Sequence, residues 1–448
     1  MEKLWQKDKV SLKEVETFTV GKDRELDLLL APFDVLGSIA HVTMLGSVGL
    51  LEDKEVGVLV QKLREIFALV SEPGFVLEEG VEDIHSQVEL MLTRMLGDAG
   101  KKIHSARSRN DQVLVDVKLF LRAELTKLMA EVREFFDLLQ EKSEAYKEYL
   151  FPGYTHLQLA MPSSFGLWFG AYAESLVDDA VQLRAAYTVV NKNPLGSAAG
   201  YGSSFPINRT MTTQLLGFDD LNYNVVYAQM GRGKVERIVA MALAGVAETL
   251  GRLSMDACLY LNQNFDFISF PAELTTGSSI MPHKKNPDVF ELIRSHCNRI
   301  KALPGEVMMM TTNLPSGYHR DLQLLKEHLF PAFRTLTECL RMAQLMLRNV
   351  SIKKDILKDE KYKYLFSVEV VNRLVSEGVP FRDAYRQVGR DIEAGHFGFD
   401  GEVRHTHEGS IGNLCNDAIR SMMEQVMHSF PFARVGAAEN SLLGESSS

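Results

Sequence analysis

The chain has few of the features that mark secreted, membrane or metal-binding proteins. It contains four cysteines in 448 residues, and no two of them form a CxxC pair, so neither a disulfide framework nor a zinc site is indicated. The longest uninterrupted apolar run, Ile238 to Ala247, is about half the length that a membrane-spanning helix needs. The first residues, MEKLWQKDKVSLKEVE, are too charged for a secretory signal. We therefore expect a cytoplasmic protein with no membrane partner.

Excess positive charge and cofactor motifs are also lacking. The net charge of −10 argues against a nucleic-acid-binding surface, so local basic clusters are expected to bind small anions. No GxGxxG follows a strand, no GxxxxGK[ST] is present, and no GxSxG motif supports an esterase. His405 and His407 are two residues apart, which suits neither an HExxH helix nor a zinc knuckle. We expect no metal and no organic cofactor.

The middle of the chain is almost free of helix-breaking residues. Neither glycine nor proline occurs between residues 113 and 151, and Val117, Leu121, Leu125 and Leu128 recur there at helical spacing. Similar segments follow at residues 163–191, 235–270, 288–303 and 321–350, the last with Pro331 as an expected kink. The pattern predicts an all-α fold with an elongated central bundle of about five long helices.

The ends of the chain are more mixed and divide it into three expected domains. These are a mainly helical N-terminal domain at residues 1–112, the bundle at 113–364 and a small helical C-terminal domain at 365–448. Segments of the bundle such as IVAMALAGVA are apolar on more than one face, which is typical of buried helices. Since so narrow a bundle offers little cover, we expect a homo-oligomer that packs helix against helix.

Five short segments combine small, polar and charged residues in the way that sites do. In GSSIMPHKKNPD, residues 277–288, serine hydroxyls and two lysines precede Asn286, which is expected to cap a helix. Hydroxyls, backbone N–H groups and ammonium charges in one small volume favour binding of a carboxylate or phosphate. An ordinary capped turn explains this segment alone equally well.

Two further segments lie in the first domain. LAPFDVLGSIAH, residues 30–41, places Ser38 and His41 on a predicted helix. HSARSRNDQ, residues 104–112, offers the forked donors of Arg109 beside Asn110, which suit carboxylates. A solvated basic turn is the alternative interpretation.

The last two segments lie in the bundle. GYTHLQLAMP, residues 153–162, is expected to open the second long helix and carries Thr155 and His156. A lone histidine is more often structural, but it is also the side chain best able to transfer protons near neutral pH. YHRDLQLLKE, residues 318–327, contains Tyr318, and its Gln323 and Lys326 would share a helix face.

These groups suffice for proton abstraction beside a carboxylate followed by loss of a leaving group. Fixed donors would stabilise the charge that spreads into the carboxylate. From the residues alone, His156 is the expected base, since a free serine hydroxyl is a very weak one.

The same segments resemble a known family over nearly the whole chain. GSSIMPHKKNPD is similar to the signature of the fumarase/aspartase superfamily, whose members release fumarate. HSARSRNDQ, GYTHLQLAMP, LAPFDVLGSIAH and YHRDLQLLKE resemble the argininosuccinate lyase family in particular, as do VEDIHSQVE and NPLGSAAG. The resemblance implies cleavage of argininosuccinate to arginine and fumarate, in arginine biosynthesis. It also implies a homotetramer whose active sites are shared between subunits.

The resemblance also implies roles for individual residues. Ser278 would be the base that removes the Cβ proton, with Lys284 stabilising its alkoxide, and His156 would serve as the acid toward the guanidino leaving group. The substrate-binding residues that it implies are Ser38, Arg109, Asn110, Thr155, Asn286, Tyr318, Gln323 and Lys326.

The chain departs from the family pattern in places. His283 stands where glutamine is usual, and LNYNVVYAQMGRGKVE, residues 221–236, lacks the usual Asn-Ser and Arg-Asp pattern. Two alternatives remain: a lyase acting on aspartate, malate or adenylosuccinate, and a structural protein on this scaffold, as lens crystallins are. The SRND and YxRDLQ segments argue against the first, and intact Ser278, His156 and Lys284 argue against the second.

Overall fold

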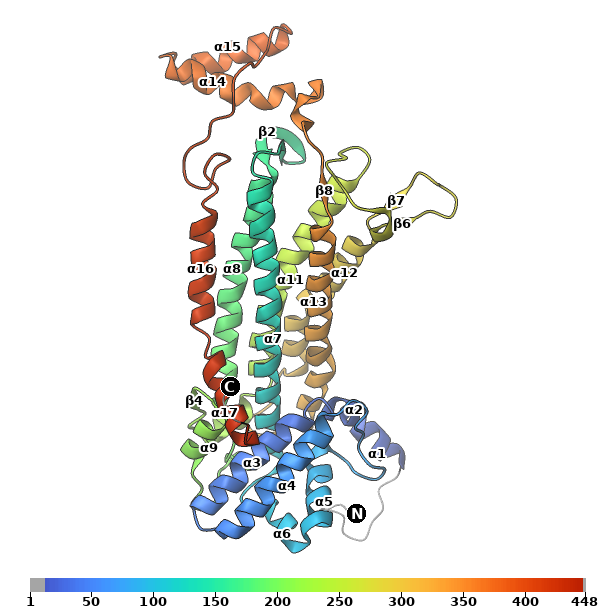
Figure 1. The fold of residues 1–448 in the computed structure, drawn as a ribbon, viewed down its shortest axis with the longest axis vertical. Helices are drawn as coiled ribbons and strands as arrows, with labels where there is room; N and C mark the ends of the chain where they lie inside the picture. Colours follow the sequence, from blue (N-terminus) through green and yellow to red (C-terminus); the bar gives the residue numbers. More distant parts are fainter. Residues whose placement is uncertain (1–12, 446–448) are drawn as a thin grey trace.

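Five long helices dominate the computed structural model, which describes residues 13–445. They lie side by side as one elongated bundle (Figure 1) and confirm the expected all-α fold. α7 alone has 37 residues, about 56 Å at 1.5 Å per residue. The five are α7 (Arg109–Ala145), α8 (Phe165–Val190), α11 (Lys234–Leu261), α12 (Asp288–Met310) and α13 (Leu325–Arg348).

The sequence of α7 explains both its start and its length. The Ser108 and Asp111 side chains form a capping box that satisfies free N–H groups of the first turn. Downstream, Leu121, Leu128 and Phe135 are fully buried against the other long helices. No glycine or proline interrupts this stripe, so the helix continues until Ala145.

Shorter helices gather at one end of the bundle, at the bottom of Figure 1. α3 packs along the start of α7, and together they bury a second apolar core. This end carries the segments that precede the long helices. They are α1 (Lys13–Val20), α2 (Asp23–Asp27), α3 (Ala31–Ser47), α4 (Asp53–Ser71), α5 (Ile84–Leu96), α6 (Asp98–Lys101) and η1 (Lys102–His104).

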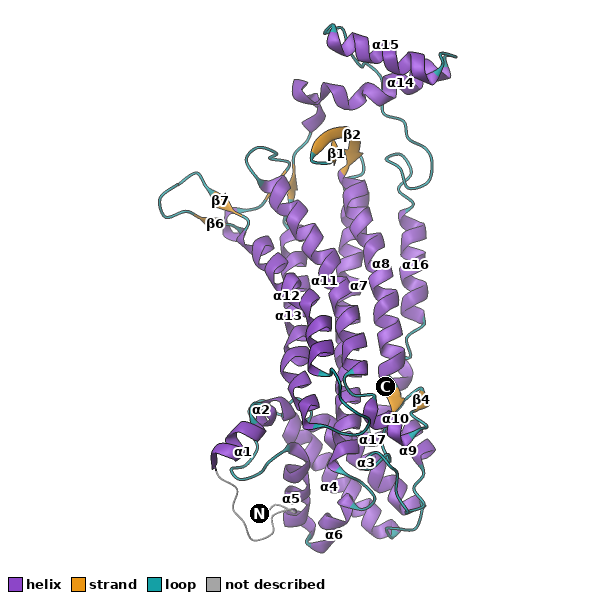
Figure 2. Ribbon diagram, turned by 180° about the vertical axis from the view of Figure 1, so that it is seen from behind, coloured by secondary structure: helices purple, strands orange, loops and turns teal. Residues whose placement is uncertain are grey.

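The C-terminal segment spans the length of the bundle. α14 (Ser367–Ser376) and α15 (Phe381–Glu393) form a pair beyond the far end, α16 (Asn416–His428) returns along α8, and α17 (Phe432–Leu443) reaches α3 (Figure 2). η4 (Ile356–Lys358) and η5 (Glu360–Phe366) lead into this segment. The domain boundaries at residues 112 and 364 remain predictions.

The THLQ segment does not open a helix, contrary to expectation. β1 (Leu150–Thr155) and β2 (Gln158–Ser164) form an antiparallel hairpin, and α8 begins only after it, with Ser164 as its cap. His156 and Leu157 form the turn with φ values of 53° and 58°, as a type I′ turn requires. The usual Asn-Gly turn signal is missing, which is why the sequence did not reveal the hairpin.

The loop after residue 277 also differs from expectation. Asn286 does not cap a helix: it lies in β7 (Lys285–Asn286), which pairs with β6 (Thr276–Gly277), and α12 begins at Asp288. α12 then continues through Pro304, where the sequence predicted its end. The remaining short elements are β3 (Lys192–Asn193), α9 (Arg209–Leu215), β4 (Asp220–Leu221), α10 (Val225–Met230), β5 (Ile268–Ser269), η2 (Ala272–Leu274), η3 (Arg320–Leu324) and β8 (Ser351–Ile352).

Large apolar side chains remain exposed along the bundle. Among the described residues, α11 is the one continuous helix long and apolar enough to cross a membrane, but 61% of its most apolar window is buried inside this chain. The exposed side chains instead spread over four helices. They are Val181, Met241, Met255, Leu292, Met308, Met309, Met342 and Leu345.

Candidate active site

Ser38 lies on α3 at the N-terminal end of the bundle, where it is 1% exposed. Its hydroxyl accepts a hydrogen bond of 3.0 Å from Arg107 Nη1, and Arg107 Nη2 donates to the Ile103 carbonyl. The basic HSARSRNDQ segment is therefore anchored to α3 rather than free in solvent. Ser38 and Arg107 line a polar pocket between α3 and α5.

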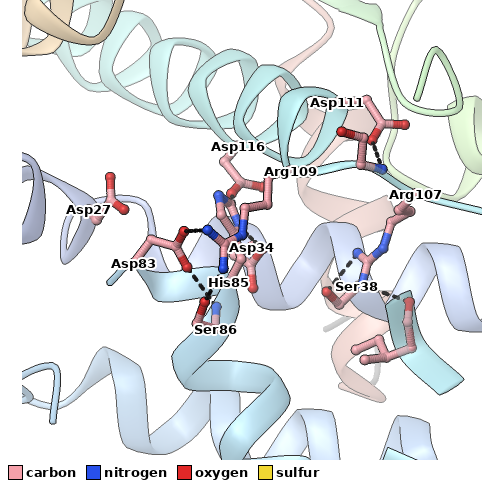
Figure 3. A network of polar contacts seen from close by, with 12 residues as sticks. Asp27, Asp34, Ser38, Asp83, His85, Ser86, Arg107, Arg109, Asp111 and Asp116 are labelled. Atoms are coloured by element: carbon pink, nitrogen blue, oxygen red, sulfur yellow. Dashed lines mark hydrogen bonds and ion pairs between the residues drawn. The ribbon is translucent and has the colours of Figure 1, made fainter. Parts of the chain in front are cut away.

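Arg109 and Asn110 form the first turn of α7. Arg109 Nη2 donates to Ser86 Oγ at 2.8 Å, and its Nη1 lies 3.2 Å from Asp83 (Figure 3). The same Nη1 lies 3.4 Å from Glu82. The Asn110 N–H donates to Ser108 Oγ. The positive charge of Arg109 is thus paired with two carboxylates of the same chain.

A buried charge cluster that the sequence did not reveal lies beneath this turn. His85 Nδ1 is 2.7 Å from Asp34 Oδ1 and 3.6 Å from Asp116 Oδ2 (Figure 3). Burial alone would lower the pKa of His85, but Asp34 and then Asp116 raise it to about 10, so the ring is an imidazolium. Burial and the neighbouring Asp34 raise the pKa of Asp116.

Within residues 13–445, the same three side chains are the one cluster with geometry suited to a metal ion. Because His85 Nδ1 already donates to Asp34, the protonated ring itself supplies the positive charge between the carboxylates. The cluster joins α3, α5 and α7, the helices that carry Ser38, Ser86 and Asn110. Asp34 and Asp116 lie in apolar stretches of the sequence. A carboxylate in such a stretch is the sequence signal that could have indicated a buried charge.

Asp111 connects the SRND turn to a second predicted segment. Its Oδ2 accepts hydrogen bonds of 3.0 Å from both Gly196 N–H and Ala198 N–H. The pKa of Asp111 is raised above its ordinary value, because burial raises it more than these N–H donors and the Ser108 N–H lower it. NPLGSAAG, residues 193–200, is therefore fixed against the start of α7.

The YHRDLQ segment reaches the same end of the bundle. Gln323 donates to the Thr19 and Val20 carbonyls at 3.0 and 3.3 Å. Lys326 is 4% exposed, with Nζ 2.7 Å from Asp27 and 2.5 Å from Asp23. Burial alone would lower the pKa of Lys326, but the two carboxylates raise it. Tyr318 is 39% exposed.

Thr155 and His156 lie far from this group. Both are exposed at the tip of the β1–β2 hairpin, which stands at the opposite end of the bundle (Figure 1). His156 and Leu157 both adopt the left-handed backbone conformation that the turn requires.

Ser278 and Lys284 lie in a third place, the loop between β6 and β7 that projects from the side of the bundle (Figure 1). Ser278 Oγ accepts hydrogen bonds from the backbone N–H groups of Ile280, at 3.3 Å, and Met281, at 3.1 Å. Lys284 is exposed, and Asn286 is half-buried with its amide 3.5 Å from Thr276 Oγ1.

The predicted residues therefore form three separate groups in one chain. Ser38, Arg109, Asn110, Gln323 and Lys326 lie on α3, α7, η3 and α13 at the N-terminal end of the bundle, and Tyr318 lies two residues before η3. The structure does not bring His156 or Ser278 to them. The roles of all these residues remain predictions.

Comparison with known proteins assigns the chain to a class. Residues 7–302 match the family described as Lyase. The solved structure of an EDDS lyase variant with bound fumarate shares the fold, with a TM-score of 0.75 over 96% of this chain and 94% of that chain at 21% identity. The family match over residues 7–302 defines the chain as a lyase of the fumarase/aspartase superfamily, and the shared fold agrees with this class.

Relatives of known activity narrow this class. The argininosuccinate lyase of Phocaeicola vulgatus is 62% identical over 443 residues, which is 99% of each chain. That of Parabacteroides distasonis is 62% identical over 442 residues, again 99% of each chain. This chain belongs to the argininosuccinate lyase family.

Proposed function

We propose that this chain cleaves argininosuccinate to L-arginine and fumarate by β-elimination, as a cytoplasmic enzyme of arginine biosynthesis. A base removes the Cβ proton, and the adjacent carboxylate takes up the charge as an aci-carboxylate. The guanidino group then leaves after protonation. Identity of 62% to argininosuccinate lyases over 99% of the chain supports this reaction. Acid–base elimination needs neither a metal nor an organic cofactor.

Ser278 is the proposed base. The observation that carries this role is the pair of backbone N–H donors, from Ile280 and Met281, directed at its Oγ. Hydrogen bonds to the charged form of a group favour that form, so these donors stabilise an alkoxide. Lys284, six residues further along the same loop, adds a positive charge without a covalent role.

His156 is the proposed acid toward the guanidino leaving group. Its exposed position at a hairpin tip lets the imidazole enter a site formed by another chain. The neighbouring Thr155 then contacts the substrate from the same hairpin. An imidazole is suited to this step because its proton is exchangeable near neutral pH.

The active site is proposed to be shared between chains of a homotetramer. Two observations support sharing: the three groups of site residues lie apart in one chain, and large apolar side chains are exposed along the bundle. Burying those side chains between bundles brings the loop of one chain and the hairpin of another to the N-terminal end of a third. Ser38, Arg109, Asn110, Tyr318, Gln323 and Lys326 would then bind substrate beside Asn286 of the loop.

One assay tests this function. Purified protein receives argininosuccinate, adenylosuccinate, aspartate and malate in turn, and fumarate release is followed by ultraviolet absorbance. We expect fumarate from argininosuccinate alone. Release from another substrate only would assign a different lyase activity, and silence on all four would favour a structural role.

A further inference from the structure

Arg232 is buried in the junction between α10 and α11, in the segment 221–236 that lacks the usual family pattern. Its Nε donates to Glu236 Oε1 at 2.6 Å, and its Nη2 donates to the Leu322 carbonyl at 3.0 Å. The Arg232 and Glu236 side chains are 5% and 3% exposed. One guanidinium therefore joins the start of α11 to η3.

The junction is shaped to hold this guanidinium. Glu236 Oε2 accepts the Gly233 N–H at 2.6 Å, so the carboxylate is fixed by the backbone as well as by Arg232. Gly233 has a φ of 78°, and a Cβ on it would lie 2.5 Å from Thr311 Cγ2. Only glycine fits here without a shift, which makes the turn a fixed support.

The other end of the contact lies among proposed substrate-binding residues. Tyr318 lies four residues before Leu322, and Gln323 follows it directly. The Gln323 side-chain amide donates hydrogen bonds to the Thr19 and Val20 carbonyls. η3 is thus anchored from α1 on one side and from the α10–α11 junction on the other. Without the second anchor, the side-chain hydrogen bonds of Arg320 and Gln323 to α1 would hold η3 from one side only.

We propose that Arg232 is a positioning residue, which sets the place of Tyr318 and Gln323 through the Leu322 carbonyl. This proposal rests on the proposed function, because its effect is read as affinity for argininosuccinate. The forked guanidinium is essential to the role: it donates in two directions at once while its charge is balanced by Glu236. A lysine ammonium in its place keeps the charge but loses the fixed fork.

The test compares steady-state kinetics of Arg232→Lys with the wild type, with fumarate release from argininosuccinate as the readout. We expect KM to rise about tenfold while kcat falls no more than about threefold, since a displaced binding segment weakens substrate capture more than proton transfer. Arg133→Lys is the matched control. Arg133 also pairs through Nε with a carboxylate four residues on, Asp137 at 2.8 Å, but it lies on α7 facing α16. The KM of the Arg133→Lys variant should stay at the wild-type value.

Glu236→Gln provides a second variant that leaves Arg232 in place. The amide oxygen still accepts the Gly233 N–H, but the guanidinium loses its counter-charge, so KM should rise in the same direction. An unchanged KM in both variants would overturn the proposal, even if their thermal stability falls. Failure of both variants to assemble as the wild type does would also overturn it, since the contact would then serve folding. A wild-type protein that releases no fumarate from argininosuccinate would instead refute the proposed function.

Discussion

Replacing His85 by glutamine tests whether the buried charge cluster stabilises the N-terminal end of the bundle. The imidazolium lies between Asp34 and Asp116, and the side chains of all three residues are at most 4% exposed. Glutamine keeps a hydrogen-bond donor but removes the positive charge from two buried carboxylates. Removing one partner of a buried ion pair typically costs about 3–5 kcal/mol, so we expect a loss of unfolding free energy in this range.

The free energy of unfolding of the wild type should decrease as the pH rises, because the folded chain raises the pKa of His85. The pKa of His85 is about 10 in the folded chain, against 6.5 as its ordinary value. A raised folded pKa contributes stability that is fully present below pH 6.5 and is lost as the pH rises toward 10. A difference of this size corresponds to about 5 kcal/mol at most, at 1.36 kcal/mol per pKa unit. Urea-unfolding midpoints at fixed protein concentration should therefore fall between pH 6.5 and pH 10.

The variant separates this effect from other titrations. His85→Gln should be less stable than the wild type at pH 6.5, and the difference in stability between the two proteins should shrink as the pH rises toward 10 and the imidazolium of the wild type loses its proton. His328→Gln is the control, because the His328–Glu306 pair is 38% and 46% exposed and should contribute little. If wild type and His85→Gln showed the same fall with pH, the imidazolium would not be the source, and the reasoning would be refuted.

Three further predictions concern catalysis. Ser278→Ala should reduce turnover at least about a thousandfold while size-exclusion chromatography shows an intact tetramer, because the alkoxide is lost; substantial remaining turnover would return the base role to His156. Inactive Ser278→Ala and His156→Asn chains, mixed and reassembled, should regain part of the wild-type activity, and no recovery in verified mixed tetramers would contradict the shared site. Lys284→Met should weaken substrate binding and turnover without altering assembly, as measured by KM and kcat; wild-type values of both would exclude its role in the site.

The sequence predicted the long helices because their signal is local. Apolar residues at helical spacing, without glycine or proline, define α7 and its neighbours, and the core found there agrees with the pattern. The hairpin was missed because His156 and Leu157 replace the residues that usually mark a type I′ turn. In the same way, the sequence predicted a cap at Asn286, but tertiary pairing with Thr276 placed it in a strand.

The candidate site was predictable only in part, because its supporting contacts join distant residues. Ser38 and Asn110 were predicted as site residues from short polar segments, and their roles stay predictions. The cluster of Asp34, His85 and Asp116 brings together three helices, and no local spacing reveals that these side chains meet. Contacts of this kind depend on the packing of α3, α5 and α7, so they became visible only in the fold.

The charges at the N-terminal end are in keeping with the proposal that another chain supplies part of the site. Lys326 is paired with Asp23 and Asp27, Arg109 lies beside Asp83, and the imidazolium of His85 lies between two carboxylates. These three cations are paired with carboxylates of the chain, and Arg107 donates to the Ser38 hydroxyl and the Ile103 carbonyl, whereas argininosuccinate brings several carboxylates of its own. In a site that excludes water, an uncompensated anion is costly. In the proposed assembly, the loop of another chain adds the exposed ammonium of Lys284, which makes no ion pair with a carboxylate within residues 13–445. Under this proposal the loop that carries the base also brings a charge for the substrate, so substrate binding and proton removal would both depend on assembly of the chains.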